Sequence, residues 1–204
     1  MAEHPHALDA PLRVIVAITG ASGVAYGVRA LELLAQRDVE THLIITRSGV
    51  ATLSHETDLS ARDVKELATV VHSPSDLGAS ISSGSFPVAG MLVAPCSVRT
   101  LSGIANSYDE DLVVRAADVT LKERRRLVLL LRETPLHAGH LRLMTQATDA
   151  GAIVMPPVPA FYHRPTTVEA IVDDTVRRAL DVLGLPLEHD RRWTGDARRA
   201  DGTG

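Results

Sequence analysis

The sequence predicts an α/β fold in which helices cover both faces of a doubly wound parallel sheet, which makes three layers. Two observations lead to this prediction. Short apolar runs rich in β-branched residues alternate with stretches that carry apolar residues at helical spacing. A glycine-rich turn, Gly20–Gly23, separates the first run from the first helical stretch. Strands joined by helices in this way are parallel, because only a crossover connection returns the chain in the same direction.

The first unit contains a strand, a turn, a helix and a second strand. Arg13–Thr19 is a β-branched run that ends at Gly20, which is the pattern of a buried strand. Val24–Gln36 carries apolar residues at helical spacing and predicts a helix. Val39–Thr46 predicts the second strand, so the two strands are expected side by side under the helix.

The later elements follow the same alternation. Short helical turns are expected at Val50–Ser54 and Ala61–Leu67, before a polar stretch around His72–Gly84. The remaining strands are predicted at Gly90–Ala94, Arg126–Leu131 and Ala152–Met155. The remaining helices are predicted at Arg99–Ala105, Ala116–Lys122, Leu136–Ala150 and Thr167–Leu183.

The composition is that of a globular protein and argues against several classes of function. Hydrophobic residues make up 45% of the 204 residues and charged residues 23%, which excludes wholesale disorder. The formal net charge of −4 argues against a nucleic-acid binder, which usually has a basic excess. We find no apolar run that could span a bilayer and no signal peptide, so we expect a cytoplasmic protein with no membrane partner. One domain is expected over 1–204, with a core of about 12–186 and polar tails at 1–11 and 188–204.

Small, hydroxylated or cationic residues follow four of the five predicted strands. These segments are Thr19–Gly23, Thr46–Gly49, Pro95–Thr100 and Arg132–Pro135. Ligands of open α/β sheets bind beyond the carboxyl ends of the strands, and this set suits an anion such as a mononucleotide phosphate. Gly20–Gly23 lacks the spacing of a dinucleotide site or a P-loop. A plain strand-to-helix turn with Ser22 as the helix cap therefore stays open as an alternative.

Other reactive side chains have two interpretations each. Arg132 can bind a phosphate or a flavin carbonyl through its forked donors, or it can pair with Glu133 at the surface. The charge run Lys122–Arg126 is typical of a solvated helix face. Cys96, the single cysteine, is interpreted as a small buried hydrophobe rather than a nucleophile.

Six sequence blocks in a fixed order carry a specific resemblance. They are TGASG at Thr19–Gly23, SGSF at Ser83–Phe86, APCS at Ala94–Ser97, RAADVTLKERR at Arg115–Arg125, RETP at Arg132–Pro135 and PPVPAFYHRP at Pro156–Pro165. Together they resemble the flavin prenyltransferases, the UbiX family, which includes the small subunits that accompany phenolic-acid and vanillate decarboxylases. The resemblance covers about Arg13–Leu185, which is nearly the whole chain.

The resemblance implies a flavodoxin-like or Rossmann-like fold, a homododecamer, and FMN bound between subunits. It implies a transferase that joins the dimethylallyl group of dimethylallyl phosphate to N5 and then C6 of reduced FMN, with release of phosphate. The product, prenylated FMN, serves a UbiD-type decarboxylase, either in quinone biosynthesis or in phenolic-acid breakdown. The family requires no metal, so His137 and His140, three residues apart on a predicted helix, are interpreted as structural.

The resemblance also implies a role for individual residues. Contacts to FMN are expected from Gly20, Ala21, Ser22, Thr46, Ser97, Val98, Arg99, Thr100 and Arg132. Contacts to dimethylallyl phosphate are expected from Tyr162, Arg178, Lys122 and Arg115. Catalytic roles are expected for Glu56, Ser22, Lys122 and Glu133. As an alternative, Glu56 caps a short helix or pairs with Arg62.

Two other functions remain as alternatives. The first is a flavin-binding accessory subunit of a hydroxyarylic acid decarboxylase complex. A mere carrier needs no groups to stabilise a leaving phosphate, so the joint presence of Lys122, Tyr162 and Arg178 favours chemistry. The second is a flavin-dependent peptidyl-cysteine decarboxylase of the same fold. It is disfavoured because Pro95–Ser97 stands where an asparagine-bearing segment is expected.

The sequence departs from the family at one aromatic position. Some relatives have a tryptophan near the position of Leu77 that can stack on the prenyl group, and no neighbour of Leu77 is aromatic here. Phe86 is the hypothetical substitute.

Overall fold

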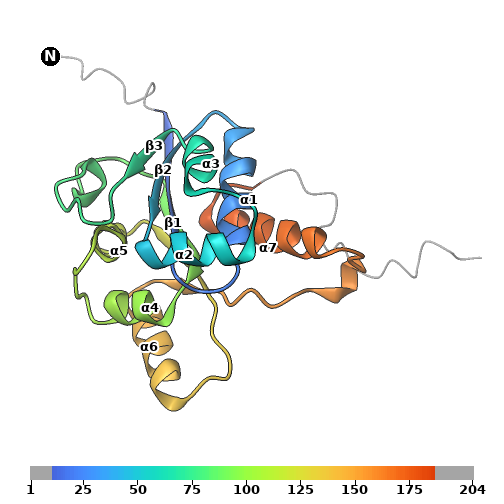
Figure 1. Cartoon of the computed structure of the whole chain (residues 1–204). Coiled ribbons are helices and arrows are strands. Elements are labelled where there is room, and N and C mark those ends of the chain that lie inside the picture. Colours follow the sequence, from blue (N-terminus) through green and yellow to red (C-terminus); the bar gives the residue numbers. More distant parts are fainter. Residues whose placement is uncertain (1–10, 187–204) are drawn as a thin grey trace, which may run out of the picture.

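A six-stranded, all-parallel sheet with strand order β3-β2-β1-β4-β5-β6 forms the centre of the molecule (Figure 1). The structure, a computed structural model, describes residues 11–186, and of His163 only the backbone. The strands are β1 (Leu12–Ile18), β2 (Val39–Ile45), β3 (Val70–His72), β4 (Gly90–Cys96), β5 (Arg126–Leu131) and β6 (Ile153–Val154). The predicted doubly wound parallel sheet is confirmed. Residues 1–10 and 188–204 of the predicted tails lie outside the described residues.

The helices form a layer on each face of the sheet. The buried residues of α1 (Val24–Ala35), α2 (Arg47–Glu56), α3 (Ala61–Glu66) and α7 (Val168–Leu183) share one hydrophobic core. Those of α4 (Val98–Ala105), α5 (Leu112–Lys122) and α6 (Ala138–Asp149), with the short 3₁₀ helix η1 (Ser80–Ser82), share the other. A second 3₁₀ helix, η2 (Phe161–His163), precedes α7.

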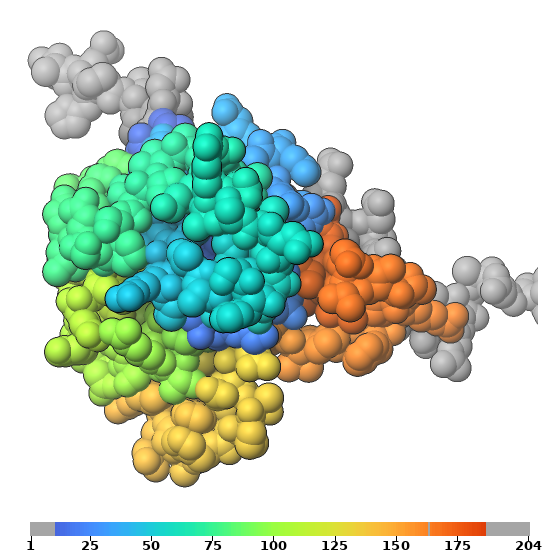
Figure 2. All heavy atoms as spheres, in the orientation of Figure 1, coloured from blue at the N-terminus to red at the C-terminus, as the bar shows by residue number. Residues whose placement is uncertain are grey.

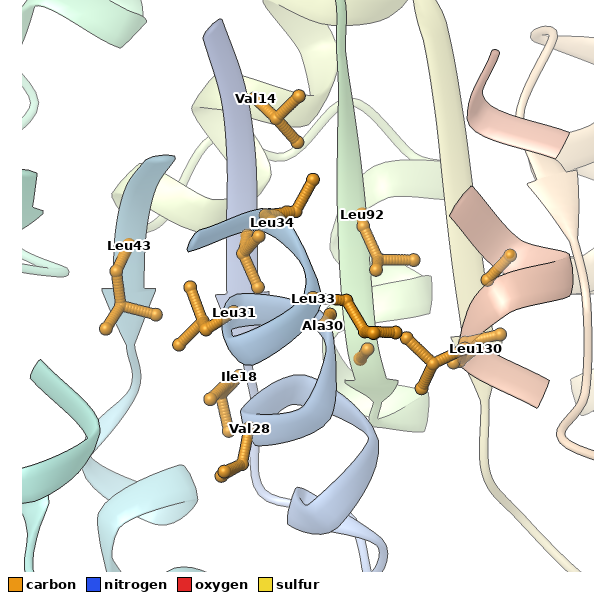
Figure 3. Packing of buried hydrophobic residues seen from close by; sticks show 14 of the residues in the cluster. Val14, Ile18, Val28, Ala30, Leu31, Leu33, Leu34, Leu43, Leu92 and Leu130 are labelled. Atoms are coloured by element: carbon orange, nitrogen blue, oxygen red, sulfur yellow. The ribbon is translucent and has the colours of Figure 1, made fainter. Parts of the chain in front are cut away.

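Strand β1 lies at the centre because its side chains are apolar on both faces. Val14 pairs with Thr41 of β2 and with Gly90 of β4. Successive residues of a strand point to opposite faces, so β1 contributes to both cores. Figure 3 shows the core on one face, where Leu31 and Leu34 of α1 lie against the strands. This packing fixes the sheet on which the loops at its carboxyl edge are mounted.

Several elements differ from the predicted boundaries. Strand β3 is an additional strand, and its three residues at the sheet edge are too few and too exposed to form a recognisable apolar run. Helix α2 is longer than the predicted Val50–Ser54. Its full length could not be predicted because it buries only Gly49 and Leu53 and so lacks an amphipathic pattern. Helix α5 starts earlier than Ala116, at Leu112, with Asp111 as its N-cap.

The strand order reverses between β1 and β4, which are neighbours although two strands separate them in the sequence. The connections after β1 and β4 therefore leave toward opposite faces of the sheet, and such a switch point forms a crevice at the carboxyl edge. Within residues 11–186, none of the helices combines the length and apolarity needed to cross a membrane.

Candidate functional site

The segments that follow β1, β2, β4 and β5 are tied to one another at the carboxyl edge of the sheet. The Thr46 N–H donates to the Ile18 carbonyl at 3.0 Å, which joins the ends of β2 and β1. The buried Thr19 hydroxyl donates to the Pro95 carbonyl at 2.7 Å and accepts from the Ser97 N–H at 2.9 Å, which joins β1 to β4. The Arg132 N–H donates to the Cys96 carbonyl at 3.0 Å. The four segments predicted to form a site therefore form one continuous edge.

A cavity of about 470 Å³ opens between the N-termini of α2 and α4. Its lining includes Thr46 and Ser48 at the start of α2, and Ser97 and Thr100 at the start of α4. Thr46 caps α2 by accepting from the Gly49 N–H at 3.0 Å, and Ser97 caps α4 by accepting from the Thr100 N–H at 3.3 Å. A side-chain cap satisfies one first-turn amide, so the other amides and both helix dipoles favour an anion in this cavity.

Two guanidinium groups add positive charge to the cavity wall. Arg99 forms an ion pair with Glu110 at 2.9 Å, and Glu110 lines the same cavity. Arg47 also lines the cavity and has no ion-pair partner within the described residues. Arg47 was not predicted as a site residue. Its position directly after the β2 run, within the segment Thr46–Gly49, is the feature of the sequence that could have identified it. Two carboxylates, Glu110 and Asp111, also line the cavity, so the donors open to an anion are the helix N-termini and Arg47, together with Arg99 when it separates from Glu110.

The Gly20–Gly23 turn packs beside this cavity. A Cβ on Gly20 would lie 2.4 Å from the Ser48 Cβ, so only glycine allows the turn to contact α2 this closely. The alternative interpretation of Ser22 as the cap of α1 is wrong. The N-cap is Gly23, and the Glu56 carboxylate accepts from the Gly23 N–H at 2.8 Å and from the Val24 N–H at 3.1 Å.

Glu56 thus lies at the turn, at the C-terminal end of α2. Burial alone would raise the pKa of its carboxyl. Hydrogen bonds from the Ser22 side chain and from the two α1 amides, together with the Arg132 charge, outweigh burial and hold this pKa below its ordinary value. The alternative pairing with Arg62 is wrong, because Arg62 pairs with Glu66 at 2.8 Å. Glu56 does cap a helix, but the helix is α1, which has 12 residues.

Arg132 directly follows the last residue of β5, and its charge acts on Glu56. Glu133, its neighbour in the sequence, accepts from the Thr134 N–H at 3.0 Å. The ion pairs of the described residues do not include Arg132 with Glu133. The surface-pair alternative for Arg132 is therefore wrong in this structure.

Lys122 and Arg115 lie away from this edge. Lys122 is the last residue of α5, three residues before the loop ends and β5 begins at Arg126, and it pairs with Glu123. Arg132 follows the last residue of β5. The six residues of β5 span roughly 20 Å at about 3.3 Å per residue. Lys122 and Arg132 therefore lie beyond opposite ends of this strand. Arg115 pairs with Asp109 at 3.1 Å and with Asp118 at 3.4 Å.

Tyr162 and Arg178 lie on a third part of the molecule. Tyr162 belongs to η2, in a segment from 156 to 167 that projects from the body beside α7 (Figure 2). In this segment Val158, Phe161 and Tyr162 are 76%, 69% and 64% exposed. Arg178 lies on α7 and contacts Asp181 at 2.6 Å. The predicted substrate residues thus occupy separate surfaces of one chain.

Cys96, His137 and His140 have structural roles. Cys96 is fully buried, and burial raises the pKa of its thiol to about 12. His137 caps α6 by accepting from the Gly139 N–H at 2.9 Å, and its ring stacks on His140. In residues 11–186 no cluster of His, Cys, Asp and Glu has a geometry that could hold a metal ion.

Phe86, the hypothetical substitute for the tryptophan that some relatives have near Leu77, packs at the amino end of the strands. Its ring contacts the edge of His42, with centroids 5.2 Å apart, and the guanidinium of Arg13 at 4.8 Å. Arg13 lies near the start of β1, so within one chain Phe86 cannot shield a ligand beside Ser22.

The chain is similar to known proteins over most of its length. The Flavoprotein family model matches residues 2–179. A flavin prenyltransferase UbiX from Thauera aromatica is 55% identical over 188 residues, covering 92% of this chain and 97% of the relative. A flavin prenyltransferase UbiX from Salmonella typhimurium is 58% identical over 186 residues, covering 90% and 98%.

Two solved structures are similar over the same region. AnUbiX (PadA1), in complex with FMN and dimethylallyl pyrophosphate, is 45% identical and superposes with a TM-score of 0.87, covering 90% of this chain and all of that one. A dodecameric FMN-dependent UbiX-like decarboxylase from Escherichia coli O157:H7 is 48% identical, with the same TM-score of 0.87 and the same coverage.

A doubly wound sheet with an anion cavity at its switch point, matched by the Flavoprotein model, defines an α/β flavoprotein. The identities of 55–58% over nine-tenths of the sequence are more specific. The chain belongs to the UbiX family of flavin prenyltransferases.

Proposed function

We propose that this protein transfers the dimethylallyl group of dimethylallyl phosphate to N5 and C6 of reduced FMN and passes prenylated FMN to a UbiD-type decarboxylase. The observation that carries the proposal is the cavity between the N-termini of α2 and α4, in a chain of the UbiX family. The enzyme acts without a metal. We place it in the cytoplasm and treat residues 1–204 as one domain.

The cavity fits the phosphate end of FMN. Its volume of about 470 Å³ lies within the usual range of small-molecule sites, roughly 300–1,000 Å³. Thr46 and Ser97 supply hydroxyls, the amides of Val98 and its neighbours supply donors, and Arg47 and Arg99 supply charge. The turn Gly20–Ser22 packs on Ser48 beside the cavity. This position supports the proposal that the flavin ring lies along the turn, toward Arg132.

Bound reduced FMN supplies an electron-rich ring whose N5 and C6 receive the dimethylallyl group. The carbon–oxygen bond of dimethylallyl phosphate breaks, and its electron pair leaves with the phosphate. Lys122, Arg115 and Arg178 meet the departing charge, and the Tyr162 hydroxyl donates a hydrogen bond to it. In the ligand-free chain each of the three cations contacts a carboxylate, so substrate binding replaces one anionic partner with another.

Two carboxylates complete the proposed chemistry. Glu56 lies beside Ser22 and stays ionised because its pKa is lowered, so it can accept a proton released as bonds form on the flavin. Ser22 donates to Glu56 and thereby orients it. Glu133, next to Arg132 at the end of β5, is the second carboxylate and lies near the leaving phosphate in the proposed complex.

The proposed active site is shared between subunits. Lys122 and Arg132 lie at opposite ends of β5, so a ligand that contacts both must lie between two copies of the chain. The exposed apolar segment around Tyr162 is a natural subunit contact, because such a surface is costly to leave in water. A homododecamer like that of the E. coli relative would bring these surfaces together.

Phosphate release under anaerobic conditions tests the proposal. The protein is mixed with reduced FMN and dimethylallyl phosphate, and inorganic phosphate is measured over time. We expect one phosphate for each FMN, and none when FMN is oxidised or left out. Tight binding of FMN without phosphate release would contradict the proposal and favour the accessory-subunit alternative.

A further inference from the structure

The Arg99–Glu110 ion pair spans the rim of the anion cavity. Arg99 lies on the first turn of α4, and Glu110 lies in the loop between α4 and α5. The Arg99 Nη2 and the Glu110 Oε1 are 2.9 Å apart, and the two side chains are 73% and 53% exposed. Both residues line the cavity. A carboxylate therefore already binds the guanidinium that the proposed function assigns to the FMN phosphate.

Glu110 is the carboxylate of this loop that is held by the cation alone. Its two acidic neighbours have other roles: Asp109 pairs with Arg115 at 3.1 Å, and Asp111 caps α5 by accepting from the Val114 N–H at 3.0 Å. The backbone of the loop is anchored, since the Tyr108 N–H donates to the Gly103 carbonyl at 2.9 Å and the Glu110 N–H to the Tyr108 carbonyl at 2.8 Å. The Glu110 side chain can therefore leave Arg99 and return to it while the loop stays in place.

Flavin is a product of the proposed reaction, so the enzyme must let it go. A phosphate at two helix N-termini and two guanidinium groups is bound strongly, and every contact to it slows release. We propose that Glu110 competes with the flavin phosphate for Arg99 and thereby speeds release of the flavin product. This inference rests on the proposed function, because it requires FMN in the cavity between α2 and α4.

The exchange costs little in either direction. An exposed ion pair contributes at most about 1 kcal/mol, since water solvates both partners when the pair opens. Arg99 is paired with Glu110 before the flavin binds and with Glu110 again after it leaves, so its charge is never left without a partner. Loss of the Glu110 carboxylate should therefore strengthen FMN binding by about three- to fivefold. This change corresponds at most to the free energy of one exposed ion pair.

Flavin binding to the intact full-length protein tests the inference. The dissociation constant and the release rate are measured by flavin fluorescence for Glu110→Gln, with FMN and with riboflavin, which lacks the phosphate. We expect Glu110→Gln to bind FMN about three- to fivefold more tightly and to release it correspondingly more slowly. Riboflavin binding should not change, which also shows that the variant is folded.

Two further variants make the test specific. In an Arg99→Gln background, Glu110→Gln should no longer affect FMN binding, because the contested cation is gone. Glu66→Gln is the matched control, since Glu66 forms an exposed pair with Arg62 outside the cavity. Equal FMN release rates in wild type and Glu110→Gln, or an equal change for riboflavin, would overturn the inference alone. Failure of the wild-type protein to bind FMN would overturn the inference and the proposed function together.

Discussion

The Glu56 carboxylate stabilises the fold and is also assigned to the proposed chemistry. It accepts hydrogen bonds from the first amides of α1, and it lies beside Ser22 and Arg132. A sequence shows that Glu56 lies at the end of a helical stretch, but the N-cap of the partner helix, Gly23, lies 33 residues earlier. The capping contact could not be predicted because it depends on how α1 and α2 pack.

The first prediction separates binding from chemistry at Glu56. Glu56→Gln keeps the shape of the side chain but removes its ability to take a proton. We expect FMN binding close to that of wild type and formation of the cyclised flavin slowed by about 10²–10⁴-fold, the usual contribution of a general base. Glu66→Gln is the control. Product formation at the wild-type rate would leave Glu56 with its capping role only.

The second prediction concerns the pH dependence of stability in the same variant. Glu56 titrates near 4.5 in an unfolded chain and at a lower pH in the folded protein. Its stabilisation is therefore complete above about pH 4.5 and is lost as the pH falls through the folded-state pKa. At neutral pH, Glu56→Gln should lower the free energy of unfolding by roughly 0.5–1 kcal/mol. Denaturant unfolding of wild type and Glu56→Gln, from neutral pH to below about pH 4.5, checks this prediction. A difference in the free energy of unfolding that grows toward low pH would contradict it.

At the scale of elements, apolar periodicity predicted most of the sheet and its main helices. β5 spans Arg126–Leu131 as predicted, and α7 differs by one residue at its start. Both bury a regular set of apolar residues, so burial and sequence pattern coincide. The pattern failed at β3, which has three partly exposed residues, and at α2, which buries only Gly49 and Leu53, because neither element has a regular apolar face.

The third prediction tests the packing of α1 on the sheet. A Cβ on Gly27 would lie 2.3 Å from the Ala94 carbonyl oxygen and 2.6 Å from a side-chain carbon of Ile18. Gly27→Ala should therefore destabilise the protein by about 1–3 kcal/mol, as overpacked cores do. Gly78→Ala is the matched control, because a Cβ there meets a side-chain oxygen of Asp76 at 3.4 Å. Equal melting temperatures for the two variants would contradict the close helix–sheet contact.

At the scale of the whole molecule, the candidate site is divided among three surfaces. The segments around Ser22, Thr46 and Ser97 could be predicted together, because parallel strands end at the same edge of a sheet. The positions of Lys122 and Tyr162 relative to this edge could not, because their place in the proposed complex depends on contacts between chains. Sequence motifs identify such residues but do not show which subunit supplies them.

The fourth prediction uses this division. Lys122→Ala and Arg132→Ala should each abolish product formation. When the two variants are unfolded together and reassembled, about a quarter of the shared sites should combine an intact Arg132 from one chain with an intact Lys122 from another. Partial recovery of activity in the mixture, measured against each variant reassembled alone, would support a shared site. No recovery in mixed oligomers would contradict it.

Mass spectrometry of the flavin tests the central claim most directly. Wild-type protein is incubated anaerobically with reduced FMN and dimethylallyl phosphate. The flavin is then extracted and its molecular mass is measured. The proposed function predicts a flavin heavier by one dimethylallyl group, with attachment at both N5 and C6 and loss of the phosphate from the substrate. Recovery of unmodified FMN from protein that binds both ligands would contradict it.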